Sequence, residues 1–118
     1  MEIASQELSH AELITIGGRV DSVEAVRFEE ALKAANRRGK YRLIIDMSQL
    51  EYMSSAGFRA LASAQRNSQR HRDGELVLTG VPAAIREGLE MVGFTEHFMI
   101  IEPLSAALEY AQSSSATS

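Results

Sequence analysis

The sequence predicts an α/β fold: a mixed, mainly parallel β-sheet covered by about four helices, with the elements in the order ββαβαβαβα. Short apolar segments rich in β-branched residues alternate along the chain with segments whose apolar residues recur every three or four positions. The 118 residues are 45% hydrophobic and contain no linker long enough to divide them. One domain with helical layers on a mostly parallel sheet accounts for these features.

The first predicted elements are a β-hairpin and a helix. Residues 12–16 alternate in polarity as a strand does, and residues 3–8 supply the strand before it. Asp21 is placed to cap the following helix, with Glu24 as its capping-box partner, and Gly39 ends the helix after a basic last turn. The apolar stripe that should enter the core is formed by Ala25, Phe28, Leu32 and Ala35.

The central part of the chain repeats the strand–helix pattern. Residues 41–46 form a short apolar strand that we expect to be buried on both faces, and a helix begins after residues 54–57. The next strand covers residues 75–79, and Gly80 and Pro82 open a third helix. The core-facing positions are Phe58, Leu61, Ala62 and Gln65 in the second helix, and Ile85, Gly88, Leu89 and Val92 in the third.

The last predicted elements are a strand over residues 98–101 and a fourth helix. Pro103 starts this helix, because proline is favoured at the first helical position. Its apolar stripe comprises Leu104, Ala107, Leu108 and Ala111. Residues 113–118 are small and mostly polar, so we expect a disordered tail after a domain that spans residues 1–112.

The composition argues against several classes of function. The net charge of −4 argues against a nucleic-acid partner, since phosphate binding requires clustered basic residues. The absence of cysteine excludes disulfides and thiolate catalysis. His10, His71 and His97 lack the spacing of metal ligands, so neither a metal nor a cofactor is expected. There is no signal peptide and no apolar run near the ~20 residues that span a bilayer, which predicts a cytoplasmic protein without a membrane anchor.

Two segments lie where α/β proteins carry functional groups, at the carboxyl ends of strands. Residues 17–21 follow the second strand, and residues 46–57 follow the third. If these strands are neighbours, the two segments form one surface. Two acidic residues there have structural roles as well, Asp21 as a helix cap and Asp46 as an acceptor for nearby loop amides.

Ser54 and Ser55 stand at the start of the second helix and have two interpretations. One of them can cap the helix, since serine is a favoured N-cap residue. One can also accept a phosphoryl group, whose charge a helix N-terminus accommodates. Ala56 and Gly57 are small, so they would leave the serine uncovered and allow close backbone approach.

Three arginines share one face of the second helix. Arg59, Arg66 and Arg70 are separated by seven and four residues, which places them on the same side of a helix. They form either a solvated face or a docking stripe that runs back from Ser55. The sequence pattern alone leaves both interpretations open.

The segment around the two serines resembles the signature of the STAS domain, named for sulfate transporters and anti-sigma factor antagonists. Residues 18–21 resemble the family's segment before the first helix, and residues 92–94 resemble a hydrophobic segment near the end of the third. The resemblance implies a single STAS-like domain, with which the predicted element order agrees. The signature is carried by Asp46-Met47-Ser48, Leu50 and Tyr52-Met53-Ser54-Ser55-Ala56-Gly57-Phe58-Arg59.

The resemblance also implies a function. Stand-alone members of the family are anti-sigma factor antagonists. Their unphosphorylated form binds an anti-sigma factor that is also a serine kinase of the histidine-kinase-like ATPase type, and this frees the sigma factor. The serine that this kinase phosphorylates matches Ser55, and a serine phosphatase resets the switch. Ser54 stands where many members carry Asp, so Ser54 is the second candidate for phosphorylation.

The small size of the chain and its modest apolar surface lead us to expect a monomer or weak homodimer. By the resemblance, we expect it to bind its partner around the phosphorylated serine. An alternative with the same fold is a stressosome-type scaffold, or another STAS regulatory module that controls a non-sigma output. The partner-binding residues that the resemblance implies are Asp21, Asp46, Ser54, Ser55, Ala56, Gly57, Phe58 and Arg59.

Two other classes of protein fit the sequence less well. An enzyme is not expected, because the chain has no GxSxG elbow, P-loop or GxGxxG motif. A receiver domain would use Asp46 as its phosphoacceptor, but it also requires an acidic pair after an early strand and a lysine near the last one. No adjacent acidic pair follows the early strands, and no lysine occurs after Lys40.

Overall fold

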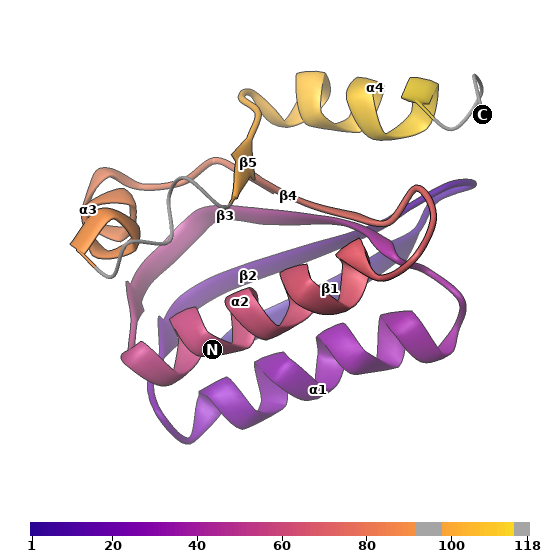
Figure 1. Ribbon diagram of the computed structural model, residues 1–118. Helices are drawn as coiled ribbons and strands as arrows, with labels where there is room; N and C mark the ends of the chain where they lie inside the picture. The colour runs from indigo at the N-terminus through magenta and orange to yellow at the C-terminus, as the bar shows by residue number, and fades with distance from the viewer. Residues whose placement is uncertain (92–97, 115–118) are drawn as a thin grey trace.

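The computed structural model describes residues 1–91 and 98–114, and it forms a sheet with helices on both faces (Figure 1). The strands are β1 (Glu2–Glu7), β2 (Glu12–Val20), β3 (Arg42–Met53), β4 (Glu75–Thr79) and β5 (Met99–Ile100). The helices are α1 (Glu24–Arg37), α2 (Ser55–Gln69), α3 (Ala83–Met91) and α4 (Leu104–Ser114). This order confirms the predicted ββαβαβαβα pattern and the α/β class.

Within the described residues, the strands of the sheet lie side by side in chain order, β1-β2-β3-β4-β5. β1 pairs with β2 in the antiparallel sense, and the pairs β2–β3, β3–β4 and β4–β5 are parallel. The sheet is therefore mixed and mainly parallel, as predicted. Because β2, β3 and β4 are parallel neighbours, their carboxyl ends lie toward the same edge of the sheet.

The helices create a hydrophobic core on each face of the sheet. Helices α1 and α2 lie together on one face, and α4 lies on the other (Figure 1). Phe28 of α1 and Leu61 of α2 are fully buried in the first core, while Ala107 of α4 is fully buried in the second. Ile44 contributes to the second core and Ile45 to the first, so β3 is buried on both faces as predicted. All the predicted core-facing residues of α1 and α2 are buried.

The two strands that carry the functional segments are longer than predicted. β2 continues through Gly18 to Val20 and β3 continues to Met53, so residues 17–20 and 47–53 are strand rather than loop. The ladder between the two strands shifts register twice, and Gly18 has a φ of 78°. These irregularities interrupt the period-two alternation of polarity, which is why the sequence pattern did not reveal the longer strands.

Helix α4 also extends past its predicted limit. It runs to Ser114, so the first two residues of the predicted disordered tail are helical. The rest of that tail, the hydrophobic segment 92–94 and His97 lie outside the described residues.

A hydrogen bond attaches α4 to the start of β4. The Tyr110 hydroxyl donates to Glu75 Oε1 at 2.7 Å. This bond, together with burial and the Glu75 charge, raises the pKa of Tyr110, while the charge of Arg42 opposes the shift. Because the folded state has the raised pKa, the stabilisation is complete below the unfolded value of ~10 and is lost as pH rises through the folded pKa.

The raised pKa of Tyr110 predicts a difference in alkaline stability. We expect the melting temperature of the wild-type chain to fall more steeply above pH ~10 than that of Tyr110→Phe, which has no proton to lose. Differential scanning fluorimetry across this pH range measures both slopes. Parallel curves would contradict the role of the hydrogen bond.

Candidate functional site

Strands β2 and β3 end side by side and bring together the ends of the two predicted functional segments, residues 17–21 and 46–57. Val20 and Met53 are register partners at the ends of these strands. The backbone N–H of Ser54 donates a hydrogen bond to the Val20 carbonyl at 2.8 Å. Asp21 and Ser54, each the first residue after its strand, therefore leave the sheet as neighbours. The strand pairing confirms that the two segments meet where β2 and β3 end.

Asp21 caps the turn that leads into α1. Its Oδ1 accepts a hydrogen bond from the Glu24 N–H at 2.8 Å, and its carbonyl accepts from the Ala25 N–H at 2.9 Å. Val23, directly before the helix, makes no side-chain cap, so Asp21 supplies this interaction as predicted. The other half of the predicted capping box, a hydrogen bond from the Asp21 N–H to the Glu24 carboxylate, was wrong. The Glu24 carboxylate accepts instead from Arg27 Nη1 at 2.7 Å.

Ser54 and Ser55 have different surroundings at the start of α2. Ser54 is the N-cap: its Oγ accepts from the Gly57 N–H at 3.3 Å, and its carbonyl accepts from the Phe58 N–H at 3.1 Å. Ser55 is the first residue of the helix and is exposed. Among the described residues, no hydrogen bond engages the Ser55 hydroxyl. The capping role therefore belongs to Ser54, and the side chain of Ser55 remains accessible.

The capping role of Ser54 makes a prediction about stability. Ser54→Ala removes the acceptor for the Gly57 N–H, and we expect it to lower the free energy of unfolding by about 1 kcal/mol. Ser54→Asp keeps an acceptor and adds a charge that the helix dipole favours, so we expect a stability at or above that of the wild type. Urea denaturation measures both variants. An equal loss in both would contradict the capping role of the hydroxyl.

Asp46 is separated from the two serines by the part of β3 that follows it. The strand rises roughly 20 Å between Asp46 and Met53, at ~3.3 Å per residue. Asp46 Oδ1 accepts from the Ser48 N–H at 3.0 Å, which confirms the predicted bond to a nearby amide. The same oxygen would lie 3.0 Å from a Cβ built on Gly80, so Asp46 packs against the segment after β4. The structure does not bring Asp46 to Ser55, because strand continues where the sequence predicted a loop.

Gly57 and Phe58 lie beneath the surface. A Cβ on Gly57 would fall 2.5 Å from Met53 Cγ, so glycine allows α2 to pack closely on the end of β3. Phe58 is only 8% exposed, and its ring fills the space beside Gly88 of α3. Both residues hold the start of α2 in place. Ala56 is half-buried and does not cover Ser55, and Arg59 is exposed.

A groove of about 380 Å³ runs between α1 and α2, and Ala56, the residue after Ser55, lines it. The prediction from sequence did not identify its α1 wall, where Val26 is 69% exposed. Val23, one turn earlier, is 75% exposed. Both valines fall off the apolar stripe of α1, and that departure was the available signal. Residues that line the groove include Val26 and Glu29 of α1, and Ala56, Arg59, Ser63 and Arg66 of α2.

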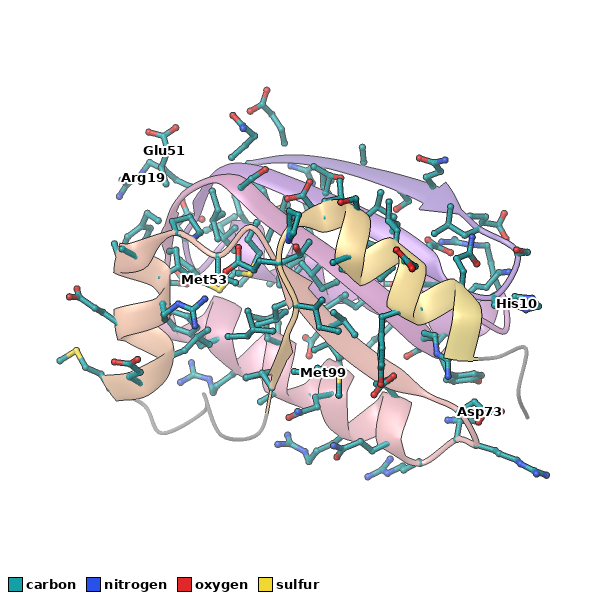
Figure 2. All side chains as sticks on the ribbon, turned by 90° about the horizontal axis from the view of Figure 1, so that it is seen from above. His10, Arg19, Glu51, Met53, Asp73 and Met99 are labelled. Carbon is teal, nitrogen blue, oxygen red and sulfur yellow. The ribbon has the colours of Figure 1, made fainter. Side chains whose placement is uncertain are left out.

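Near the ends of β2 and β3, Arg19 and Tyr52 form a cation–π pair that the prediction from sequence did not identify. The Arg19 guanidinium lies over the Tyr52 ring, 4.4 Å from its centroid, and Tyr52 is 40% exposed. Figure 2 shows Arg19 and Glu51 at the same end of the sheet, pointing outward. This cation–π contact fixes Arg19 beside the point where the chain leaves the sheet.

The described residues form neither a cluster of potential metal ligands nor a membrane-spanning helix. Residues 1–91 and 98–114 contain no group of three or more potential metal-ligating side chains. No helix in the same part of the chain has the length and hydropathy needed to cross a bilayer.

Sequence comparisons extend the likeness across most of the chain. A family model described as Mlab, STAS domain, matches residues 3–102. BtrV of Bordetella bronchiseptica, which is classed with the anti-sigma factor antagonists, is 30% identical over 107 residues, covering 91% of each chain.

Solved structures share the fold. An anti-sigma factor antagonist from Mycobacterium paratuberculosis matches with a TM-score of 0.84 at 21% identity, covering 94% of this chain and 93% of its own. The Bacillus cell fate determinant SpoIIAA in its phosphorylated form gives 0.72 at 15% identity, covering 92% of this chain and 99% of its own. Sheet order, helix placement and the family match agree: the chain belongs to the STAS domain family.

Proposed function

We propose that this chain is an anti-sigma factor antagonist that works by partner switching. With Ser55 unmodified, it binds an anti-sigma factor that is also a serine kinase of the histidine-kinase-like ATPase type, and the sigma factor is released. The kinase then transfers the γ-phosphoryl group of ATP to the Ser55 hydroxyl, which ends binding. A serine phosphatase removes the phosphate and restores the active form.

The observation that carries this proposal is the division of roles between the two serines. Ser54 satisfies the helix backbone, while Ser55 presents a free hydroxyl at the first position of α2. A kinase can therefore modify Ser55 without removing the cap. The sequence similarity to BtrV supports an antagonist, and the likeness in fold to SpoIIAA, whose structure is known in a phosphorylated form, supports a phosphorylated one.

The proposed partner-binding surface surrounds Ser55 at the end of β2 and β3. Asp21 and Arg59 are exposed there, while Ser54 and Ala56 are half-buried. Gly57 and Phe58 support this surface from below, and Asp46 lies apart from it. A phosphate on Ser55 would stand in the middle of the proposed contact area, where added negative charge opposes binding.

The fold itself should tolerate the phosphate, since its charge of about −2 would meet the positive end of the α2 dipole. Arg59 is one turn further along, and helical side chains extend toward the N-terminus, so its guanidinium can approach the phosphate. We expect phosphoserine at position 55 to raise the stability of the chain by up to about 1 kcal/mol.

This stability prediction can be tested without the kinase. Phosphoserine is incorporated genetically at position 55, and urea denaturation compares the product with the unmodified chain. Arg59→Gln should remove part of the gain while changing the unmodified chain little. A phosphorylated chain that is markedly less stable than the unmodified one would contradict the prediction.

We propose that the exchange takes place in the cytoplasm and that the chain acts as a monomer or weak homodimer. A stressosome-type scaffold would instead assemble into large particles. Size-exclusion chromatography with light scattering distinguishes the two, since a particle of many copies would contradict our proposal.

The proposed function is tested by capture of the partner from the chain's own organism. Wild type, Ser55→Ala and Ser55→Asp are immobilised, and bound proteins are identified by mass spectrometry. We expect wild type and Ser55→Ala to retain an anti-sigma factor kinase and Ser55→Asp to lose it. Equal retention by all three variants would contradict the switch.

A further inference from the structure

The charge on α2 is not balanced within the described residues. Helix α2 carries Arg59 and Arg66, its C-cap is Arg70, and it has no acidic residue. All three arginines are exposed, and none forms an ion pair within residues 1–91 and 98–114. On the neighbouring helix α1, by contrast, the arginines pair with glutamates of the same helix. On a chain whose net charge is −4, this stripe is a local concentration of unpaired positive charge.

The stripe is extended. Arg59 and Arg70 lie about 16 Å apart along the helix axis, at ~1.5 Å per residue. Ser55 lies one turn before Arg59 on the same face. A single small anion would engage only one part of such a stripe, whereas a polypeptide segment of about three helical turns matches its length.

The stripe borders an apolar wall. Val26 lines the groove from the α1 side, and exposed Val23 continues the apolar surface one turn earlier. Arg59 and Arg66 line the opposite side, and Glu29 places one carboxylate on the α1 side. Two arginines face one carboxylate, so the charge in the groove is positive on balance. Apolar surface beside net positive charge is complementary to an amphipathic segment whose polar face is acidic.

We propose that the groove between α1 and α2 receives an acidic, amphipathic segment of the anti-sigma factor. Apolar side chains of that segment pack on Val26, and its carboxylates meet Arg59 and Arg66. This inference rests on the proposed function, and it adds the chemistry of the partner. The inference also explains how the phosphate would end binding. A phosphate on Ser55, at that end of the groove, would repel the carboxylates of the partner segment.

The test compares charge reversal inside and outside the groove. The probe is the purified anti-sigma factor that the wild-type chain retains, and isothermal titration calorimetry measures its affinity. Arg66→Glu should weaken binding at least about tenfold, because it places like charges opposite one another. Arg72→Glu makes the same charge change at an exposed position after α2, and its affinity should stay within about twofold of the wild type.

A second variant tests the apolar wall independently of charge. Val26→Ser should also weaken binding, and circular dichroism should show all three variants folded, since the changed side chains are exposed. Raising the salt concentration should weaken wild-type binding more than that of Arg66→Glu.

The outcomes separate this inference from the proposed function. If Ser55→Asp loses binding while Arg66→Glu and Val26→Ser keep it, the switch stands and the groove assignment is overturned. If no variant, including Ser55→Asp, differs from the wild type, both proposals fail. If Arg66→Glu instead abolishes self-association of the chain and leaves anti-sigma factor binding intact, the groove receives a second copy and the inference is overturned.

Discussion

Phosphorylation of Ser55 is expected to weaken binding of the anti-sigma factor by about a hundredfold or more. The modification adds a charge of about −2 at the centre of the proposed contact surface. Like-charge contacts at an interface cost several kcal/mol, and a hundredfold loss corresponds to about 2.7 kcal/mol. Isothermal titration calorimetry with the anti-sigma factor measures three affinities: for the chain with genetically incorporated phosphoserine at position 55, for the unmodified chain and for Ser55→Ala. The ratio of the first two affinities gives the loss on phosphorylation.

The matched control adds charge away from this surface. Ser5 is exposed on β1, so Ser5→Asp should leave the affinity unchanged. Ser55→Ala should bind as the wild type does, because the hydroxyl makes no hydrogen bond that the fold requires. An affinity for the phosphorylated chain within a few-fold of the unmodified one would contradict the proposed switch.

Loss of the buried charge pair between Glu12 and Arg38 is expected to have the largest effect on stability. Glu12 begins β2 with a fully buried side chain, and Arg38, directly after α1, forms its ion pair. Arg38→Met leaves the carboxylate buried without its partner. Removal of one member of a buried pair costs ~3–5 kcal/mol. Because the Arg38 side chain is 41% exposed, we expect a smaller loss, about 2–3 kcal/mol.

The neighbouring arginine provides the control for this experiment. Arg37 pairs with Glu30, but both side chains are more than 60% exposed. Arg37→Met should therefore cost less than about 1 kcal/mol in urea denaturation. The double variant Glu12→Met with Arg38→Met should recover much of the loss, since no charge then remains buried. Equal effects of Arg38→Met and Arg37→Met would contradict the account.

The element order could be predicted from the sequence because most elements carry an intact hydrophobic period. The stripe around Phe28 in α1 and the stripe around Leu61 in α2 are both buried as expected. The ends of β2 and β3 could not be predicted, because the register shifts near Gly18 disturb the alternation from which strands are recognised. The predicted position of Asp46 near the serines followed from that error, since a residue inside a long strand was taken as the last residue of a short one.

The meeting of the two segments at the ends of β2 and β3 was predicted, and the placement of individual residues there depended on tertiary contacts. Ser54 and Ser55 are equally suitable caps by residue type, and the choice is made where β3 ends: Met53 pairs with Val20, so Ser54 is the first residue outside the strand. Gly57 was interpreted as a small residue that exposes the serine and allows close backbone approach; the close approach is confirmed, and it is made to Met53. Neither the pairing of Met53 with Val20 nor the contact of Gly57 with Met53 can be predicted from a local sequence pattern.

The most direct test of the central claim is to map the phosphate after incubation with the captured kinase and ATP. Tandem mass spectrometry of the wild-type chain should find one phosphate, on Ser55, and none should be found on Ser55→Ala. Ser54→Ala should still be phosphorylated, because its capping hydroxyl is not the acceptor. Phosphate on Ser54 in the wild type, or a phosphorylated Ser55→Ala, would contradict the assignment of Ser55 as the switch.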